Sequence, residues 1–197
     1  MMFKDTDGRV TEGLGIKPGF HIGGTVEIPV SDMFYVEPGL LFSNKGVKLD
    51  RDELLEIGGG YFTVRNKGSF DLYYLDIPLN GKVKFDVGSS VKVYGTFGPY
   101  VGVGVAGKLK GKLTVSVPAP FSESYDEKIE WGSDRDTDNF KRADFGLSIG
   151  GGAEFGPFTA GVAYNHGLAN ISSYTGEGTK INNRVFSISV GYRFGDN

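Results

Sequence analysis

Residues 91–105, with the sequence VKVYGTFGPYVGVGV, decide the fold of this chain. Apolar residues such as Val93, Phe97 and Val101 occupy one phase of a two-residue repeat. Lys92 and several glycines occupy the other phase. A period of two is that of a half-exposed β-strand, because successive side chains point to opposite faces of a sheet. The stretch therefore predicts one long strand with an apolar face and a polar face.

Seven stretches of the chain share this alternation, and short turns and long connections join them in turn. This rhythm predicts an all-β fold, an antiparallel up-and-down transmembrane β-barrel of the bacterial outer membrane. No segment with helical periodicity is long enough to cover a sheet, which argues against a parallel α/β fold. We expect residues 1–197 to form a single domain, with residues 1–14 as the remnant of an N-terminal loop. The predicted strands cover residues 15–28, 33–45, 70–85, 91–108, 141–155, 158–171 and 182–194, and the long connections cover residues 46–68 and 110–139.

The composition excludes several classes of protein. The net charge of −3 is too small to indicate binding to nucleic acid. The absence of cysteine excludes disulfides, thiolate catalysis and cysteine-bound metals. No stretch approaches the roughly 20 apolar residues of a membrane-spanning helix. The first residues do not form a signal peptide, so we expect the N-terminus of this exported protein to be processed or truncated.

Charges of both signs lie on the polar phase of the predicted strands, and these charges indicate which face is enclosed. Acids and bases are roughly balanced, so they can pair inside a narrow barrel, where an unpaired charge is very costly. Glycines between them leave room for long side chains. The bulky apolar phase would be difficult to pack inside a barrel of this size, so we assign it to lipid. The predicted lumenal polar network consists of Lys17, His21, Glu27, Glu37, Asp76, Lys82, Lys92, Arg142, Asp144, Glu154 and Arg193.

Aromatic residues gather beside the short turns, where outer-membrane barrels carry an interfacial girdle. Ordinary packing at strand ends is the simpler alternative. A soluble, lipocalin-like ligand-binding barrel would also alternate, but its apolar face would point inward, with Leu75, Ile77 and Val101 inside. The predicted girdle consists of Phe34, Phe85, Phe155, Phe158, Tyr192 and Phe194.

The number of predicted strands is odd, although bacterial single-chain barrels have an even number of antiparallel strands. The first predicted strand ends in a short turn and the seventh follows a loop, so both run toward the periplasm. We therefore expect an eight-stranded type of barrel whose native first strand is missing from this chain, unless residues 1–8 supply a poor one. Phe3 to Arg9 resemble an outer loop more than a strand. The two open edges would then pair with another copy or with a partner strand.

Four short motifs carry a family resemblance over nearly the whole chain. They are KPGFHIGG at residues 17–24, YLDIPL at 74–79, GPYVG at 98–102 and GYRF at 191–194. In this order and spacing the chain resembles the small outer-membrane β-barrel family of Bacteroidetes, often labelled porin-family or PorT-like. The resemblance implies an eight-stranded barrel inserted into outer-membrane lipid by the barrel insertion machinery. It further implies a link to protein secretion for PorT-like members, and it supplies no catalytic residues.

Two motifs point to chemistry without defining a catalytic site. Residues 102–107 match GxGxxG, but a dinucleotide site needs this motif between a strand and a helix, and here it lies inside a predicted strand. His21 shares the polar phase with several serines, among them Ser43, Ser148 and Ser189. An enzyme acting on lipid or lipopolysaccharide would need His21 beside a serine and an acid. The sequence shows no such convergence.

The long connection at residues 110–139 offers two further candidates. Its acidic residues from Asp126 to Asp138 could bind calcium but lack the EF-hand spacing, so a solvated loop is the better interpretation. Tyr125, Trp131 and Phe140 form a candidate binding surface, or they fold the loop back onto the barrel rim. We predict a non-enzymatic outer-membrane barrel without cofactor or metal. Its charge-filled lumen conducts poorly, and its outer loops have structural or binding roles.

Overall fold

The computed structural model describes residues 2–4, 14–57, 60–88, 90–116, 121–134, 138–173 and 180–195. No helix in this part of the chain has the length and apolar character needed to cross a membrane. Its elements are β1 (Met2–Lys4), β2 (Leu14–Ile16), β3 (His21–Thr25), β4 (Ile28–Pro29), β5 (Phe34–Ile57), β6 (Gly60–Asp86), β7 (Val91–Ser116), β8 (Phe121–Lys128), β9 (Ala143–Phe155), β10 (Phe158–Gly167), β11 (Lys180–Asn182) and β12 (Arg184–Tyr192).

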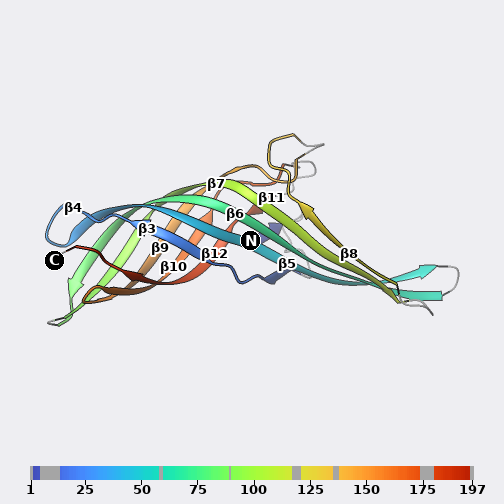
Figure 1. The fold of residues 1–197 in the computed structure, drawn as a ribbon, viewed down its shortest axis with the longest axis horizontal. Coiled ribbons are helices and arrows are strands. Elements are labelled where there is room, and N and C mark those ends of the chain that lie inside the picture. The colour runs from blue at the N-terminus through green and yellow to red at the C-terminus, as the bar shows by residue number, and fades with distance from the viewer. Residues whose placement is uncertain are drawn as a thin grey trace.

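The main sheet curls into a barrel in which each strand pairs with its neighbours in sequence (Figure 1). Its order is β12-β10-β9-β7-β6-β5, and β2, β3 and β4 follow one another along the far edge of β5. Every ladder of the sheet is antiparallel. The predicted all-β antiparallel fold is therefore confirmed. The described sheet is open between β12 at one edge and β2, β3 and β4 at the other.

The N-terminal residues differ from the prediction. Met2–Lys4, which we expected to belong to a loop, form β1 and pair antiparallel with β11. The remainder of the expected N-terminal loop, residues 5–13, lies outside the described residues.

The long connections were also predicted wrongly, because the strands continue through most of them. β5 extends to Ile57, β6 begins at Gly60, and β7 extends to Ser116 and pairs with β8. Together they form a ribbon that projects beyond the barrel (Figure 1). Both faces of this ribbon carry polar residues, so it lacks the alternation that marks a strand with one lipid-facing side. Backbone pairing between the strands holds it nonetheless.

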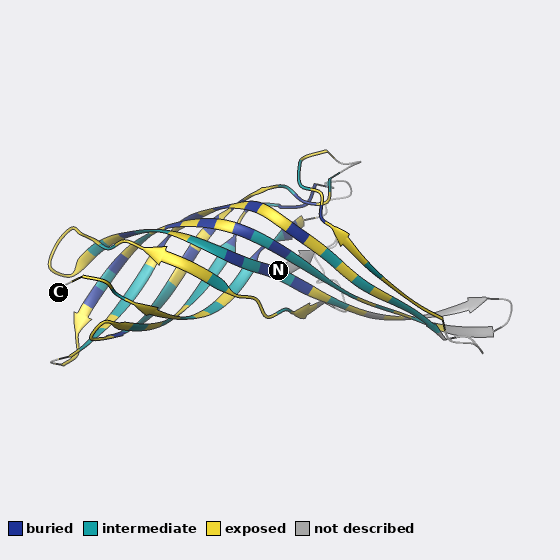
Figure 2. Cartoon of the chain, in the orientation of Figure 1, coloured by how far each residue is buried: buried dark blue, intermediate teal, exposed yellow. Residues whose placement is uncertain are grey.

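The two phases of each strand face opposite environments, as the alternating bands in Figure 2 show. On β6, Tyr74 and Asp76 are buried, whereas Leu75 is 40% exposed and Ile77 is 50% exposed. Val101 on β7 is 55% exposed. The soluble-barrel alternative required these three apolar side chains inside, so it is wrong. The apolar phase is the outer surface of the barrel.

A small apolar core closes the outer end of the barrel. Leu72 and Tyr74 of β6 pack there with residues that follow β8, β10 and the last outer loop, namely Ile129, Phe140, Ala169, Ile171 and Ile181. A Cβ atom on Gly104 would lie 2.3 Å from the Trp131 ring, and one on Gly107 would lie 2.8 Å from Ile129. The glycines of the GxGxxG motif thus make room on the inner face of β7 for the returning segment.

Replacement of Gly104 tests this fit. Trp131 is the only tryptophan, so its emission reports the position of the segment directly. Gly104→Ala should displace the ring, shift the emission to longer wavelength and lower the free energy of unfolding by about 1–3 kcal/mol. Gly95→Ala on the same strand is the matched control, because its Cβ would lie 3.7 Å from Val83, an ordinary contact. Identical emission spectra for the two variants would contradict the packing.

Candidate functional site

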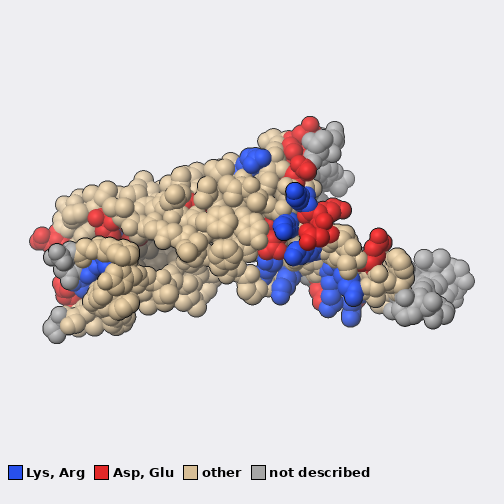
Figure 3. All heavy atoms as spheres, viewed as in Figure 1, with Lys and Arg blue, Asp and Glu red and all other residues tan. Residues whose placement is uncertain are grey.

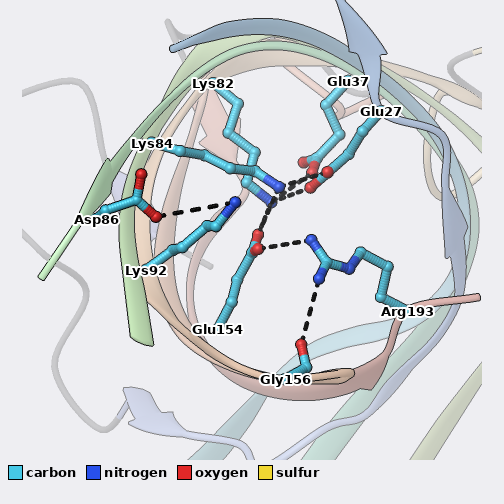
Figure 4. A network of polar contacts seen from close by, with 9 residues as sticks. All are labelled: Glu27, Glu37, Lys82, Lys84, Asp86, Lys92, Glu154, Gly156 and Arg193. Atoms are coloured by element: carbon cyan, nitrogen blue, oxygen red, sulfur yellow. Dashed lines mark hydrogen bonds and ion pairs between the residues drawn. The ribbon is translucent and has the colours of Figure 1, made fainter. Parts of the chain in front are cut away.

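A network of ion pairs fills the lumen near the short turns, and Figure 4 shows its side chains converging from several sides of the barrel. Lys82 Nζ on β6 lies 2.5 Å from Glu27 Oε1 and 3.0 Å from Glu37 Oε2. Lys84 Nζ lies 2.5 Å from Glu27 Oε2 and 2.8 Å from Glu154 Oε1. Both lysines are almost fully buried. We call this group, together with Arg193, the lower network.

Arg193 completes the lower network from the end of the chain. Its Nη1 donates to Glu154 Oε2 at 3.0 Å, and its Nη2 donates to the Gly156 carbonyl at 3.3 Å. Gly156 turns the chain between β9 and β10 with a φ of 57°, a conformation that favours glycine. Three cations thus meet three carboxylates in the lower network. This balance matters because one unpaired charge in such a site is strongly destabilising.

A second group, the upper network, lies closer to the outer end. Lys45 Nζ donates to Asp76 Oδ1 at 2.8 Å and to Asp144 Oδ2 at 3.1 Å. Lys45 and Asp144 have side chains that are 3% and 0% exposed. The second negative charge is offset by neutral donors, since Ser43 donates to Asp76 at 2.5 Å and Asn183 donates to Asp144 at 2.8 Å. The Lys45 ammonium also lies over the rings of two tyrosines.

The structure distributes the predicted network over these two groups and several separate contacts. Lys17 pairs with Asp71 at the outer end, and Lys92 lies 3.8 Å from Asp86 at the other mouth. Arg142 donates to the Gly104 carbonyl and joins neither network. Glu27, Glu37, Lys82, Glu154 and Arg193 lie in the lower network, and Asp76 and Asp144 lie in the upper one.

Sequence reasoning missed Lys45, the central cation of the upper network. It stands two residues after Ser43 and eight after Glu37, in the same phase of the second predicted strand. This shared phase could have identified Lys45 as lumenal, but we placed Lys45 at the end of the predicted strand. β5 continues well beyond it, so Lys45 lies inside the barrel rather than at a loop. Asn183 was missed for a similar reason, at the start of the last predicted strand.

His21 forms a contact across the opening between the two sheet edges. Its Nε2 lies 2.9 Å from Ser189 Oγ on β12. Ser43 and Ser148 bond elsewhere, to Asp76 and Asn165. Within the described residues no hydrogen bond or ion pair joins His21 to a carboxylate. The described residues of this site thus bring together a serine and a histidine, but not the acid that orients the base in a catalytic triad.

Two aromatic belts border the apolar surface. The six residues predicted as a girdle are all exposed, and Phe158 packs edge-on against Tyr192 at 5.5 Å. A second belt at the outer end, which the sequence analysis missed, is formed by Phe20, Phe42 and Tyr73 with ring centroids about 6 Å apart. At about 3.3 Å per residue and a tilt of about 40°, β6 rises about 30 Å from one belt to the other. This is the height of a membrane-spanning band. The predicted girdle residues are Phe34, Phe85, Phe155, Phe158, Tyr192 and Phe194.

Charged side chains gather beyond the second belt. Figure 3 shows the barrel body almost free of charge on one face and a dense mixed cluster where the ribbon begins. On the outward phase, Lys48 of β5 and Lys67 of β6 replace the apolar residues found lower down. The change from apolar to charged on the same phase of the same strands marks the boundary between lipid and water.

The three loop aromatics do not form an exposed surface. Phe140 is buried and meets Phe70 edge-on at 5.8 Å, while Trp131 meets Tyr74 at 5.6 Å. Tyr125 lies over Gly111. Trp131 and Phe140 thus fold the outer segment onto the rim, which was the alternative considered for these aromatics, whereas Tyr125 stays on the ribbon. In the described part of the acidic stretch, no group of three or more potential metal ligands gathers.

Removal of one charge tests the lower network. Glu154→Gln leaves Lys84 and Arg193 without their shared carboxylate and should lower the free energy of unfolding by about 3–5 kcal/mol. The measurement is urea unfolding of the protein in lipid vesicles, followed by Trp131 emission. Glu123→Gln, at an exposed position of β8, is the control and should change little. The double variant Lys84→Gln/Glu154→Gln should lose less than the sum of the single variants, and strict additivity would contradict a coupled network.

The comparisons with known proteins agree with this geometry. The family described as outer membrane protein beta-barrel domain matches residues 2–173. No curated protein and no solved structure matches the chain significantly. The apolar outer band, its two aromatic belts and the charged lumen are the features that such a barrel requires. The chain belongs to the outer membrane protein β-barrel domain family and is located in the bacterial outer membrane.

Proposed function

We propose that this protein is a non-enzymatic outer-membrane barrel whose lumen is closed to ions and whose outer end has structural or binding roles. The lower network carries this proposal. Its side chains come from β5, β6, β9 and the segments beside β3 and β12, so they meet across the lumen rather than along one wall (Figure 4).

A conducting pore needs a continuous path of water with sites weak enough for ions to leave. Here the lysine ammonium groups are already held by carboxylates at 2.5–3.0 Å, and the apolar core around Leu72 lies above them. A passing cation would have to displace a fixed lysine from these carboxylates. Blocked conduction follows from the strength of the same pairs that stabilise the barrel.

We propose a binding role for the outer ribbon. If the protein is a PorT-like member of the Bacteroidetes porin family, this role would include a link to secretion. β5 and β6 carry it past the apolar band, where a partner protein can reach it. Arg65 donates two hydrogen bonds at 2.6 Å to Asp52, and these bonds lower the pKa of the Asp52 carboxyl. Paired charges of this kind keep the ribbon hydrated while its backbone ladder keeps it extended.

Electrical recording tests the closed lumen. The wild-type protein in planar bilayers should show little or no steady conductance. The triple variant Lys82→Ala/Lys84→Ala/Glu154→Ala should still conduct little, because the upper network and the apolar core around Leu72 remain to close the lumen. Heat-modifiable migration on gels checks that the variant has folded. Large, steady conductance by the wild-type protein would refute the closed lumen.

Labelling with a fluorophosphonate probe tests the absence of serine catalysis. Ser189 lies beside His21, and no carboxylate of the described part of the chain orients that histidine, so the folded protein should not be labelled above the level of Ser189→Ala. Labelling that depends on both Ser189 and His21 would instead favour an enzyme acting on lipid or lipopolysaccharide.

A further inference from the structure

The base of the ribbon carries a group of exposed lysines on the face that continues the lipid-facing surface of the barrel. The pairing of β5, β6 and β7 places Lys48 opposite Ser69 and Ser69 opposite Lys110 on the outward phase. Four lysines and Ser69 line a shallow hollow there, and the described residues that line it include no carboxylate. We call this surface the basic face, and its lysines are Lys48, Lys67, Lys108, Lys110, Lys112 and Lys128.

Neighbouring side chains neutralise only part of this positive charge. Lys67 Nζ lies 3.1 Å from Asp50, and Lys110 Nζ lies 4.0 Å from Asp126. All four of these side chains are more than half exposed or close to it, so water screens both pairs. Among the described residues no ion pair involves the other four lysines of the basic face. The basic face therefore keeps an excess of positive charge that attracts anions.

The sign of the charge distinguishes this face from the other face of the ribbon. On β8, Lys128 shares the outward phase with Ser124 and Asp126, whereas Glu123 and Glu127 alternate with them and lie on the opposite face. Hydration alone would be served by charges of either sign. In Figure 3 basic side chains gather where the ribbon leaves the barrel body. An excess of lysine on one face is typical of a surface that meets a negatively charged partner.

The basic face begins directly above the second aromatic belt. On β6, Tyr73 of that belt lies two residues from Asp71, which is opposite Lys108, and four residues from Ser69. A strand tilted by about 40° rises about 5 Å for every two residues, so the two rows of side chains lie about 5 Å and 10 Å above Tyr73. The headgroup layer extends roughly 5–8 Å beyond the hydrocarbon core on each side of a bilayer. Flexible lysine side chains in both rows can therefore reach the level of the headgroups.

The surface below the basic face suits the remainder of a lipid. Leu75 and Val103 lie side by side on the outward phase of β6 and β7, and both are exposed. A free anion in water would gain only contacts with exposed lysines, and such contacts are weak. A lipid adds acyl contacts with the apolar band, and the membrane holds its headgroup at a high effective concentration beside the lysines. These contacts favour a membrane lipid over a soluble anion as the occupant.

We propose that the basic face binds an outer-leaflet lipid whose headgroup carries phosphate groups. The lysine ammonium groups would pair with the phosphate oxygens, and the Ser69 hydroxyl would donate a hydrogen bond to one of them. The acyl chains would lie along the apolar band below. This contact would fix the depth and rotation of the barrel in the outer leaflet. The proposal rests on the location in the outer membrane and is independent of whether the lumen conducts.

Energy transfer from Trp131, the only tryptophan, tests the proposal. Trp131 packs on Gly104 of β7, and Lys110 lies six residues further along this strand, about 20 Å away at about 3.3 Å per residue. The protein is folded in nanodiscs of phosphatidylcholine that contain a trace of dansyl-labelled lipid A, a glycolipid that carries phosphate groups. Dansyl-labelled phosphatidylcholine measures the transfer that random encounters produce.

Loss of charge on the basic face should weaken this binding. Lys48→Gln/Lys112→Gln should lower the apparent affinity for labelled lipid A at least about tenfold, because each basic side chain near the surface adds to the attraction for anionic lipid. Lys48→Arg/Lys112→Arg keeps the charge and should bind like the wild type. Lys92→Gln/Lys180→Gln is the matched control, since it removes the same charge at the other mouth and in β11. Added salt should release the labelled lipid from the wild-type protein.

Competition identifies the occupant. Unlabelled lipid A should displace the labelled lipid, whereas lipid A without its phosphates should not. Displacement by inorganic phosphate at the same concentration would overturn the proposal in favour of a site for free anions. Displacement by polyglutamate at the same concentration would overturn it in favour of an acidic polypeptide.

Equal binding by Lys48→Gln/Lys112→Gln and by the matched control would also refute the proposal, as would transfer to lipid A no greater than transfer to phosphatidylcholine. Heat-modifiable migration of each variant confirms that a negative result comes from folded protein. Conductance recorded from the same variants keeps the two proposals separate, because these substitutions lie outside the lumenal networks and should leave the closed lumen unchanged.

Discussion

The hydrogen bonds of the backbone are the constraint on which this structure depends. A bilayer offers no water to unpaired N–H and C=O groups, so a chain that crosses it with strands must pair them with one another. The antiparallel ladders from β5 to β12 satisfy this requirement. The side chains of each strand then alternate between lipid and lumen. The apolar phase, the two aromatic belts and the charged interior all follow from that division. At the opening between β3 and β12, the described strands leave this requirement unmet.

Pairing the backbone into a barrel encloses the polar side chains of the inner face, and the charged ones among them need partners. Most charges of the two networks are removed from water, so each of these needs a partner at close range. The lower network balances three cations with three carboxylates, whereas the upper network holds two aspartates with one lysine and neutral donors. At the outer end, apolar side chains fill much of the lumen, because Trp131 and Ile129 pack into the space left by glycines of β7. A narrow barrel is thus filled by three different kinds of contact along its length.

The functional features lie at the two boundaries of this filled barrel. Beyond the outer belt, the same strands continue as a hydrated ribbon, and several of its charges form ion pairs on its surface. Beside the lumen, His21 and Ser189 meet across the opening between β3 and β12, and none of the described carboxylates orients the histidine. The proposed role as a rigid, non-conducting scaffold is based on these two boundaries.

The sequence by itself determined the strands within the membrane, their faces and the odd strand count, because a two-residue period survives wherever one face meets lipid. It also indicated the lumenal charges, including Lys82 and Glu154, since charge on the enclosed phase needs a partner. It did not reveal the ribbon, where both faces are hydrated and the alternation disappears. Nor did it show that Lys45 centres a second network, that Trp131 and Phe140 pack inward, or that Met2–Lys4 pair with β11. Only the tertiary structure decided these, because they depend on which distant residues the barrel brings together.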